Sequence, residues 1–277
     1  MANLKSYKKY IVKFSIFEGT PNIVNIDQHL ALKKYILLLV ITIAAITVKA
    51  QSGYNYQEFG IGAGASYIRG YTNVTRQDNH PAFNVNFIYN YNPYVPIEAE
   101  VQVGTLSGGG LLPTQDPYGR VYSNNYKALV IHGDFQLGAG IDYSGDWLLQ
   151  ILKDFYVGTG AGLISNTVTV QRYSIYAPPY PQPGYYKFPG HDNSLDLMLP
   201  LRVGYEFKIY DSYNEPSVAI DVGYVHTFVF NEGLDGYDDP PSKFKNNAPD
   251  QYRQITIMVK YFFGNVTSYN KLIREFK

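Results

Sequence analysis

Hydrophobic and polar residues alternate with a period of two along most of the chain after residue 50. The clearest case is Leu195–Phe207, where the odd-numbered positions carry Leu, Val, Tyr or Phe and the even-numbered ones include Asp196, Arg202 and Glu206. Side chains that alternate in this way point to opposite faces of a β-strand. The pattern therefore predicts strands with one apolar and one polar face.

Eight segments carry this alternation, and helical spacing fits none of them as well. They are Gln57–Arg69, Ala82–Tyr91, Val95–Val103, Asn125–Ile141, Phe155–Gln171, Leu195–Ile209, Ser217–Phe230 and Tyr252–Phe263. Long and short connectors alternate between them, which is typical of a barrel with one end at the cell exterior and the other in the periplasm. In the fifth segment the alternation changes phase near Ser165, and this change predicts a β-bulge.

The direction in which each face points does not follow from periodicity, because a soluble lipocalin-like barrel and a membrane barrel place their apolar faces oppositely. Glycine lies at every second position of Gly60–Gly64 and Gly158–Gly162 on the polar faces, and small residues suit the crowded lumen of an eight-stranded barrel. Aromatic residues gather at strand ends, as in Tyr261–Phe263, in the manner of membrane girdles. The predicted fold class is all-β: an eight-stranded antiparallel, up-and-down transmembrane β-barrel over residues 51–263.

The chain before the barrel has the pattern of an export signal. A Lys-Lys pair precedes fourteen apolar-rich residues, Tyr35–Val48, and Ala50 offers a small residue for cleavage. Fourteen residues are too few for a helix that crosses a bilayer, so an uncleaved anchor is the weaker alternative. We assign 32–50 to a cleavable signal peptide and leave 1–31 unassigned, as an extension that a misassigned translation start would explain. Residues 264–277 are assigned to a periplasmic C-terminal tail.

The amino-acid composition narrows the class of protein further. A content of 45% hydrophobic and 16% aromatic residues argues against disorder, and the absence of Cys excludes disulfides, thiolate metal sites and thiol nucleophiles. Residues 1–50 hold 7 Lys/Arg and 2 Asp/Glu of the 23 and 23, which leaves 16 and 21 for the rest of the chain. An acidic body argues against nucleic-acid binding. We expect the exported chain to reside in the outer membrane of a Gram-negative bacterium.

One connector, residues 142–154, is longer than the alternation of long and short predicts. It holds Trp147 and several Leu and Ile residues behind Asp146, which is a candidate helix cap. One interpretation is an amphipathic helical turn in the inner headgroup layer, where Trp prefers to lie. The other is an ordinary helix packed beneath the barrel.

The polar faces bring ionisable side chains into the predicted lumen. Because an isolated buried ion costs several kcal/mol, we expect a paired network that fills the barrel, with a narrow pore as the alternative. Arg202 is expected to reach Asp221 or the Glu98/Glu100 pair, and Glu58 and Lys208 are expected to face the lumen as well. The network comprises Glu98, Glu100, His132, Asp134, Arg202, Glu206, Asp221 and Lys260. Near the end of the last strand, Tyr261 and Phe263 are expected to serve as an aromatic insertion signal.

Motifs for catalysis and metal binding are weak. An outer-membrane acyl hydrolase needs a Ser beside a His on one strand face, whereas His226 is followed by Thr227 and Phe228. His132 and Asp134 share a face without a neighbouring Ser, and the acidic segment Asp235–Asp239 lacks the spacing of a calcium loop. Glycine-rich segments lie within strands and are not followed by a helix, which argues against phosphate or dinucleotide loops. We predict no enzyme activity, no cofactor and no metal.

Three motifs near the start of the barrel resemble a known group. They are the glycine-rich Glu58–Tyr71, Pro81–Phe83 with Tyr89–Tyr94, and Glu98–Gly108, which ends in Gly-Thr-Leu-Ser-Gly. Together they are similar to the PorG-like small outer-membrane barrels, accessory proteins of type IX secretion. The group usually closes its first strand with Gly-Asp, and this chain has Gly70 and Tyr71 there. The resemblance implies an outer-membrane barrel associated with secretion machinery, without an active site.

From these observations we expect a non-enzymatic outer-membrane barrel that acts as a scaffold or accessory component of an envelope or type IX secretion-related complex. Its partners would be outer-membrane lipid and envelope proteins, the latter bound through the outer loops and periplasmic turns. The alternatives are a small porin or apolar-solute channel and, less favoured, an envelope hydrolase.

Overall fold

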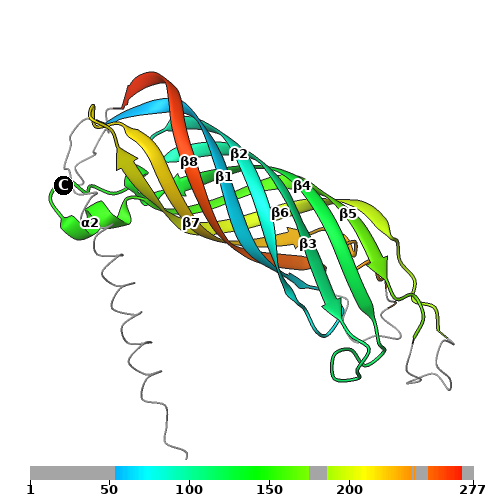
Figure 1. Ribbon diagram of the computed structural model, residues 1–277. Helices are drawn as coiled ribbons and strands as arrows, with labels where there is room; N and C mark the ends of the chain where they lie inside the picture. The colour runs from blue at the N-terminus through cyan, green and yellow to red at the C-terminus, as the bar shows by residue number, and fades with distance from the viewer. Residues whose placement is uncertain (1–53, 175–185, 239, 241–248, 270–277) are drawn as a thin grey trace, which may run out of the picture. The chain divides into compact units, whose positions relative to one another are not determined.

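Eight strands form one antiparallel sheet that closes on itself in a computed structural model, which describes residues 54–174, 186–238, 240 and 249–269 (Figure 1). Each strand pairs with its neighbour in sequence, and β1 pairs with β8 to complete the ring. The predicted all-β, eight-stranded up-and-down barrel is confirmed. The strands are β1 (Tyr54–Tyr71), β2 (Asn79–Asn92), β3 (Val95–Gly109), β4 (Val121–Gln136), β5 (Phe155–Val170), β6 (Asn193–Tyr210), β7 (Pro216–Val229) and β8 (Gln251–Tyr269). The predicted extension and signal peptide lie outside the described residues.

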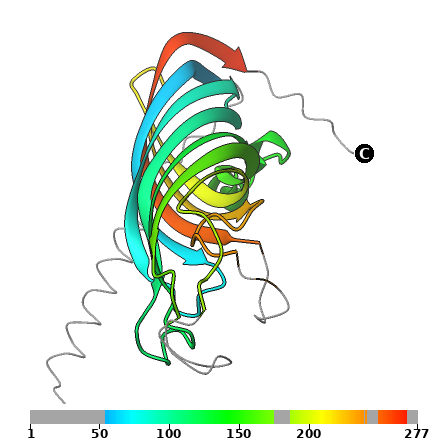
Figure 2. The ribbon, with the colours of Figure 1, turned by 90° about the vertical axis from the view of Figure 1, so that its right-hand side faces the viewer.

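The two ends of the barrel carry different connections. Residues 93–94 and 211–215 make short turns at the end where β1 begins and β8 finishes. Longer connections between β1 and β2, β3 and β4, β5 and β6, and β7 and β8 lie at the opposite end (Figures 1 and 2). Outer-membrane barrels place short turns in the periplasm and long loops outside the cell. We call these the inner end and the outer end.

The last strand is longer than the sequence pattern indicates. Residues Val266–Tyr269 continue β8 and pair with Tyr54–Gln57 of β1, so the barrel extends past residue 263 and the predicted tail 264–277 begins too early. Gly264 has φ +106°, a conformation that favours glycine, and the register shifts between Gln57 and Phe59. This local irregularity interrupts the alternation while the two strands remain paired.

The predicted bulge near Ser165 is wrong. β5 pairs with β4 in an unbroken register, with Ser165 opposite Lys127. The apolar phase changes because Ile164 and Val168 point into the barrel while Ser165 and Thr167 point outward. The polarity of the two faces therefore changes along the strand, while the backbone keeps its regular pairing.

The connector between β4 and β5 contains the predicted helix. β4 ends at Gln136, before the expected Ile141, because a 3₁₀ turn, η1 (Leu137–Ala139), follows. α2 (Trp147–Leu152) begins at Asp146, whose side chain accepts a hydrogen bond from the Leu148 N–H, as predicted. None of the residues of α2 is buried, and its backbone is held by the Tyr205 hydroxyl, which donates to Ile151 O at 2.8 Å. Within the described residues, no helix is long and apolar enough to cross a membrane.

The outer wall of the barrel is apolar at mid-height. Leu195 and Leu197 are 67% and 61% exposed, and similar side chains surround the ring on every strand. On the same strand, Asp196 and Arg202 are buried inside. A soluble barrel would have the opposite arrangement, so this exterior is a surface for lipid. Because the sheet is closed, every strand pairs on both sides, and the backbone N–H and C=O groups are satisfied without solvent, which lipid cannot replace. The lipid belt comprises Ile61, Phe83, Val85, Phe87, Val101, Leu129, Ile131, Val157, Leu163, Leu195, Leu197, Leu201, Ile257 and Val259.

Candidate functional site in the barrel lumen

The inner half of the lumen is organised around Lys260 of β8. Its Nζ lies 2.6 Å from Glu98 Oε1, 2.9 Å from Glu206 Oε2 and 2.9 Å from Asp221 Oδ2. These carboxylates come from β3, β6 and β7, and all four side chains are buried. One ammonium group, with its three donors, therefore joins four strands across the barrel.

Arg202 of β6 is the second cation of the lumen. Its Nε donates to Asp134 Oδ1 at 3.1 Å, and its Nη1 donates to Glu100 Oε2 at 3.3 Å. His132 lies between these acids, with Nε2 3.2 Å from Glu100 and Nδ1 3.5 Å from Asp134. Of the two predicted partners of Arg202, the structure brings Glu100 to it, whereas Asp221 contacts Lys260.

Lys208 closes the inner end of the lumen. Its Nζ donates to Gln136 Oε1 at 2.5 Å and to Pro93 O at 2.9 Å, and lies 3.2 Å from Asp154 Oδ1. Burial raises the pKa of the Asp154 carboxyl, and the nearby Lys208 opposes that rise. Asp154 follows α2 in a connector, where no alternation could have shown that it faces inward. Glu58 lies elsewhere, since its Oε2 accepts a hydrogen bond from Asn265 at an exposed position.

Acids outnumber permanent cations in this network, and amides compensate. Asn84 Nδ2 donates to Glu100 Oε1 at 2.8 Å, Asn86 Nδ2 to Glu98 Oε2 at 2.5 Å, and Gln102 Nε2 to Glu100 Oε1 at 2.9 Å. Glu98 and Glu100 thus face a cation with one carboxylate oxygen and accept neutral amide donors with the other. The acids are Glu98, Glu100, Asp134, Asp154, Glu206 and Asp221, and the bases are Arg202, Lys208, Lys260 and His132.

A buried tyrosine extends across the lumen over two glycines. The Tyr156 hydroxyl donates to Asp221 Oδ1 at 2.8 Å. A Cβ atom at Gly204 or Gly223 would lie 2.5 Å from that hydroxyl oxygen, which is closer than packing allows. These two inward glycines therefore make room for the ring. Tyr156 occupies an inward position of β5, and the alternation of the sequence indicates this position. The alternation does not indicate that the tyrosine hydroxyl contacts Asp221.

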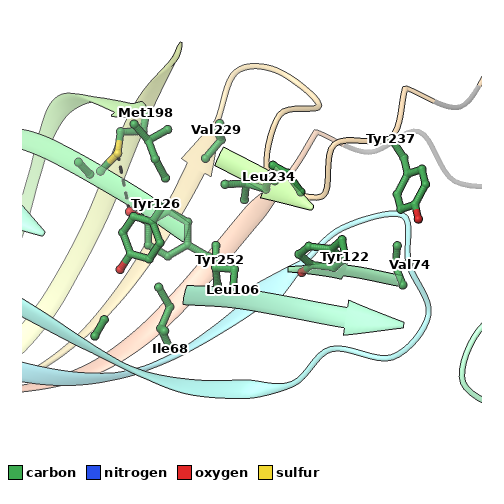
Figure 3. Close-up of a cluster of buried hydrophobic side chains, with 14 of the residues drawn as sticks. Ile68, Val74, Leu106, Tyr122, Tyr126, Met198, Val229, Leu234, Tyr237 and Tyr252 are labelled. Atoms are coloured by element: carbon green, nitrogen blue, oxygen red, sulfur yellow. Dashed lines mark hydrogen bonds between the residues drawn. The ribbon is translucent and has the colours of Figure 1, made fainter. Parts of the chain in front are cut away.

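The outer half of the lumen contains a large apolar cluster, where the sequence predicts a polar interior, next to buried polar side chains such as Asn124, Asn166 and Asp196. Figure 3 shows aromatic and aliphatic side chains from several strands converging inside the ring. Tyr126 and Tyr252 lie with ring centroids 5.9 Å apart, and the Tyr252 hydroxyl is 3.7 Å from Met198 Sδ. We call this cluster the apolar plug: Ile68, Leu106, Tyr122, Tyr126, Ile164, Val168, Met198, Val229, Leu234 and Tyr252.

The outer loops fold over this plug. Arg120 Nη2 donates to Asp116 Oδ2 at 2.9 Å and to Asn73 O at 2.7 Å, which joins the β1–β2 and β3–β4 loops. The same guanidinium lies 5.8 Å from the ring centroid of Tyr237, whose hydroxyl donates to Gln171 O at 2.9 Å. Burial raises the pKa of Tyr237, which keeps the phenol protonated as a donor.

A small cavity lies in the lumen of the described part of the barrel. A cavity of about 10 Å³ lies at the inner end, next to Gln136, Glu206 and Lys208. Such a volume holds about one water molecule. Among the described residues, no group of three or more His, Asp or Glu side chains has an arrangement that could hold a metal ion.

Comparisons with known proteins return the same architecture and no family. No protein-family model matches the chain, and no curated protein matches it. Among solved structures, Neisserial surface protein A is 10% identical with a TM-score of 0.44, covering 77% of this chain and 100% of that one. Ail of Yersinia pestis, solved with the heparin analogue sucrose octasulfate, is 14% identical with a TM-score of 0.40, covering 75% and 99%. OprG of Pseudomonas aeruginosa is 11% identical with a TM-score of 0.30, covering 77% and 99%.

Likeness at these identities concerns the fold alone. The features that assign the chain to its membrane are its own: a closed eight-stranded ring, an apolar exterior and a charged interior. Only helices and closed barrels satisfy their backbone in lipid, and closed barrels with short turns at one end are the outer-membrane form. The chain is a transmembrane β-barrel of the bacterial outer membrane.

Proposed function

We propose that the protein is a non-conducting, non-enzymatic barrel that holds other envelope components at the outer membrane. The observation that carries the proposal is the closed lumen. Ion pairs fill its inner half, the apolar plug fills its outer half, and the loops joined by Arg120 cover the plug. A barrel whose lumen is filled in this way presents its rims and its lipid-facing wall to other molecules.

The polar network is assigned a structural role in this proposal. His132 is buried between Glu100 and Asp134, out of reach of any substrate that arrives from solvent or lipid. Within the described part of the chain its imidazole faces Glu98, Glu100 and Asp134, and no Ser or Thr hydroxyl is hydrogen-bonded to it. This environment supports a charge-balancing role in place of catalysis.

Partners are proposed to bind at the two rims. The outer rim offers loops that are fixed to one another by Arg120 and Tyr237, and the inner rim offers α2 and the turn at 211–215. The narrower proposal, an accessory role in type IX secretion, rests on the three motifs between Glu58 and Gly108. It concerns the identity of the partners and not the barrel itself.

Crosslinking in native membranes, followed by purification in mild detergent and identification of attached proteins, tests the scaffold. We expect defined envelope proteins to be crosslinked to the barrel, with type IX components among them if the narrower proposal holds. A barrel that stays alone under crosslinking conditions that capture a known neighbouring complex would contradict the scaffold. Other envelope partners would contradict only the type IX role.

Conductance distinguishes the scaffold from a small porin or apolar-solute channel. A channel would require the plug residues Tyr126 and Tyr252 to leave their positions. We expect no steady conductance from the purified protein in planar lipid bilayers. Regular open-channel currents that change in an Arg202→Ala variant would favour the channel.

Tyr261 and Phe263 are proposed as the insertion signal of the last strand. Both point outward near the inner end of β8, and Phe263 lies beside Phe59 with ring centroids 6.5 Å apart. We expect Phe263→Asp to reduce assembled barrel in the membrane about tenfold, because a carboxylate at this aromatic girdle opposes transfer into lipid. Val266→Asp, beyond Gly264 on the same strand, is the control and should assemble nearly normally. Heat-modifiable migration of membrane fractions measures both.

A further inference from the structure

Three basic side chains stand in a row on the outward face near the outer end. Arg253 of β8 lies directly opposite Arg69 of β1 on one side and His226 of β7 on the other. None of the three belongs to the lumen network, and all are partly exposed on the outer wall. We call them the basic row.

The basic row lacks an anion among the described residues. Like charges placed directly opposite on neighbouring strands are destabilising, so Arg69 and Arg253 repel each other. Neither arginine forms an ion pair in the described part of the chain, and Arg69 Nε is buried without a hydrogen-bond partner. Arg253 instead lies over the ring of Tyr71, 5.1 Å from its centroid. The His226 Nε2 lies 2.9 Å from Gln251 Oε1.

A groove opens beside the basic row. Its volume is about 460 Å³, which is large enough for a sugar phosphate headgroup. No acidic side chain lines it within the described residues, and its walls combine Arg69 and His226 with hydroxyl and amide groups. The lining residues are Arg69, Tyr71, Thr72, Thr75, Gln77, His226, Pro249 and Gln251.

The groove lies directly above the lipid belt. Below it on the same strands, Tyr67, Tyr224 and Ile255 are exposed, followed by Ile257. Arg69 and Arg253 are the first charged residues at the outward positions of β1 and β8 above the apolar wall, and Tyr71 and Gln251 follow them toward the outer end. The basic row is therefore at the height of the outer-leaflet headgroups, and the apolar wall beneath it is continuous with the surface that contacts acyl chains.

We propose that this groove binds a phosphorylated glycolipid of the outer leaflet. Its phosphate accepts hydrogen bonds from the guanidinium group of Arg69, which lines the groove, and from that of Arg253, which lies opposite Arg69 at the edge of the groove. Guanidinium groups suit phosphate oxygens in a bidentate geometry. The sugar contacts Thr75 and Gln251, and the acyl chains follow the wall toward Ile257. The anion relieves the repulsion within the basic row, and the continuity of groove and belt selects a lipid over a soluble phosphate.

Binding of bisphosphorylated lipid A to the detergent-solubilised protein, measured by native mass spectrometry, tests the site. We expect it to bind at least tenfold more tightly than the same lipid after enzymatic removal of its phosphates. Arg69→Gln and Arg253→Gln should each weaken binding about fivefold, and the double variant about 25-fold. Inorganic pyrophosphate at equal concentration should not displace the lipid.

Lys127→Gln is the matched control, because Lys127 is an exposed outward cation on β4, away from the groove. It should bind lipid A like the unaltered protein. Equal loss in this control, equal binding of the dephosphorylated lipid, or displacement by pyrophosphate would each overturn the proposal. The single Arg253→Gln variant provides the same test if the double variant fails to form the heat-modifiable barrel.

Discussion

The Lys260 side chain is shielded from solvent. It is 1% exposed, and the three carboxylates around it come from three other strands. Removing one member of such a buried cluster leaves charges unpaired, which costs more than the pairing itself contributes. The lumen network is therefore sensitive to single substitutions although it is redundant in acids.

Lys260→Met keeps the length of the side chain and removes its charge. We expect a loss of about 3–5 kcal/mol in the free energy of unfolding, because Glu98, Glu206 and Asp221 lose their shared cation. Denaturant titration in detergent, followed by heat-modifiable migration, measures it. Lys127→Met removes an exposed outward charge and should change the free energy of unfolding by no more than about 0.5 kcal/mol. Equal effects would show that Lys260 is not the centre of the network.

Gly223→Ala tests the packing beneath Tyr156. The new methyl group would meet the Tyr156 hydroxyl at 2.5 Å, and overpacking of this kind costs about 1–3 kcal/mol. In a Tyr156→Phe background the cost should fall by half or more, since the clashing oxygen is gone. Gly145→Ala, where no atom lies within 4 Å of the new methyl group, should have little effect. The same cost in both backgrounds would contradict the contact.

At this scale, the alternation of the sequence predicts which residues point inward but not which ones meet. It identifies Arg202 and Glu100 as inward residues on β6 and β3, and the pairing across the ring then follows from closure. Asp154 and Tyr237 escape prediction because they lie in connectors, where no period exists. Their contacts depend on how those connectors fold back over the lumen.

Among the elements, α2 is the one whose surroundings differ most from those of a strand. Trp147 is 71% exposed, and the helix is attached to the outward-pointing Tyr205 and not to the barrel interior. An exposed Trp in the connector at the inner end of the barrel favours the headgroup layer of the inner leaflet over a position beneath the barrel.

Trp147 is the only Trp of the chain, so its fluorescence reports α2 alone. In reconstituted vesicles we expect lipids brominated near the glycerol to quench it more strongly than lipids brominated near the chain terminus. Asp146→Ala, which removes the cap of α2, should weaken this difference. Efficient quenching by aqueous iodide, without quenching by either lipid, would place the helix in the periplasm.

The sequence predicts that the eight strands exist, but it does not predict which of their faces is apolar near the outer ends. Period two locates all eight because the lipid belt makes one face uniformly apolar. Toward the outer loops the pattern reverses, as in β5, where Ile164 and Val168 face the plug. A reversal of polarity and a bulge look the same in a sequence, and only the register of Ser165 separates them.

Taken as a whole, the barrel has two environments stacked along its axis. In the membrane its charges are inside and its apolar residues outside, whereas nearer the outer loops an apolar cluster lies inside and polar residues such as Thr167 face outward. The plug, the basic row and the polar outward positions of β5 all lie on the outer side of this change.

Site-directed spin labels along β5 can locate the change. Because the chain has no Cys, single cysteines can be placed at Leu163 and Thr167, which both point outward. We expect the label at Leu163 to be relaxed mainly by oxygen, which partitions into lipid, and the label at Thr167 mainly by a water-soluble nickel chelate. Lipid contact at both positions would mean that the membrane covers the whole strand.

The function is less accessible from sequence than the membrane location. The location follows from a physical requirement that all residues of the belt share, such as Leu197 and Ile257. A partner recognises only a few rim residues, and their arrangement depends on loops that carry no period. The basic row illustrates this limit, since Arg69, His226 and Arg253 are far apart in the chain and become neighbours only through strand pairing.

The position of Lys260 on the final strand has a consequence for biogenesis. Glu98, Glu206 and Asp221 are all synthesised before it, and none of them acquires this counterion until β8 docks. A truncated chain that stops after β7 would carry these three carboxylates into the barrel without the cation that they share. The charge balance of the lumen is therefore complete only in a chain that includes its last strand.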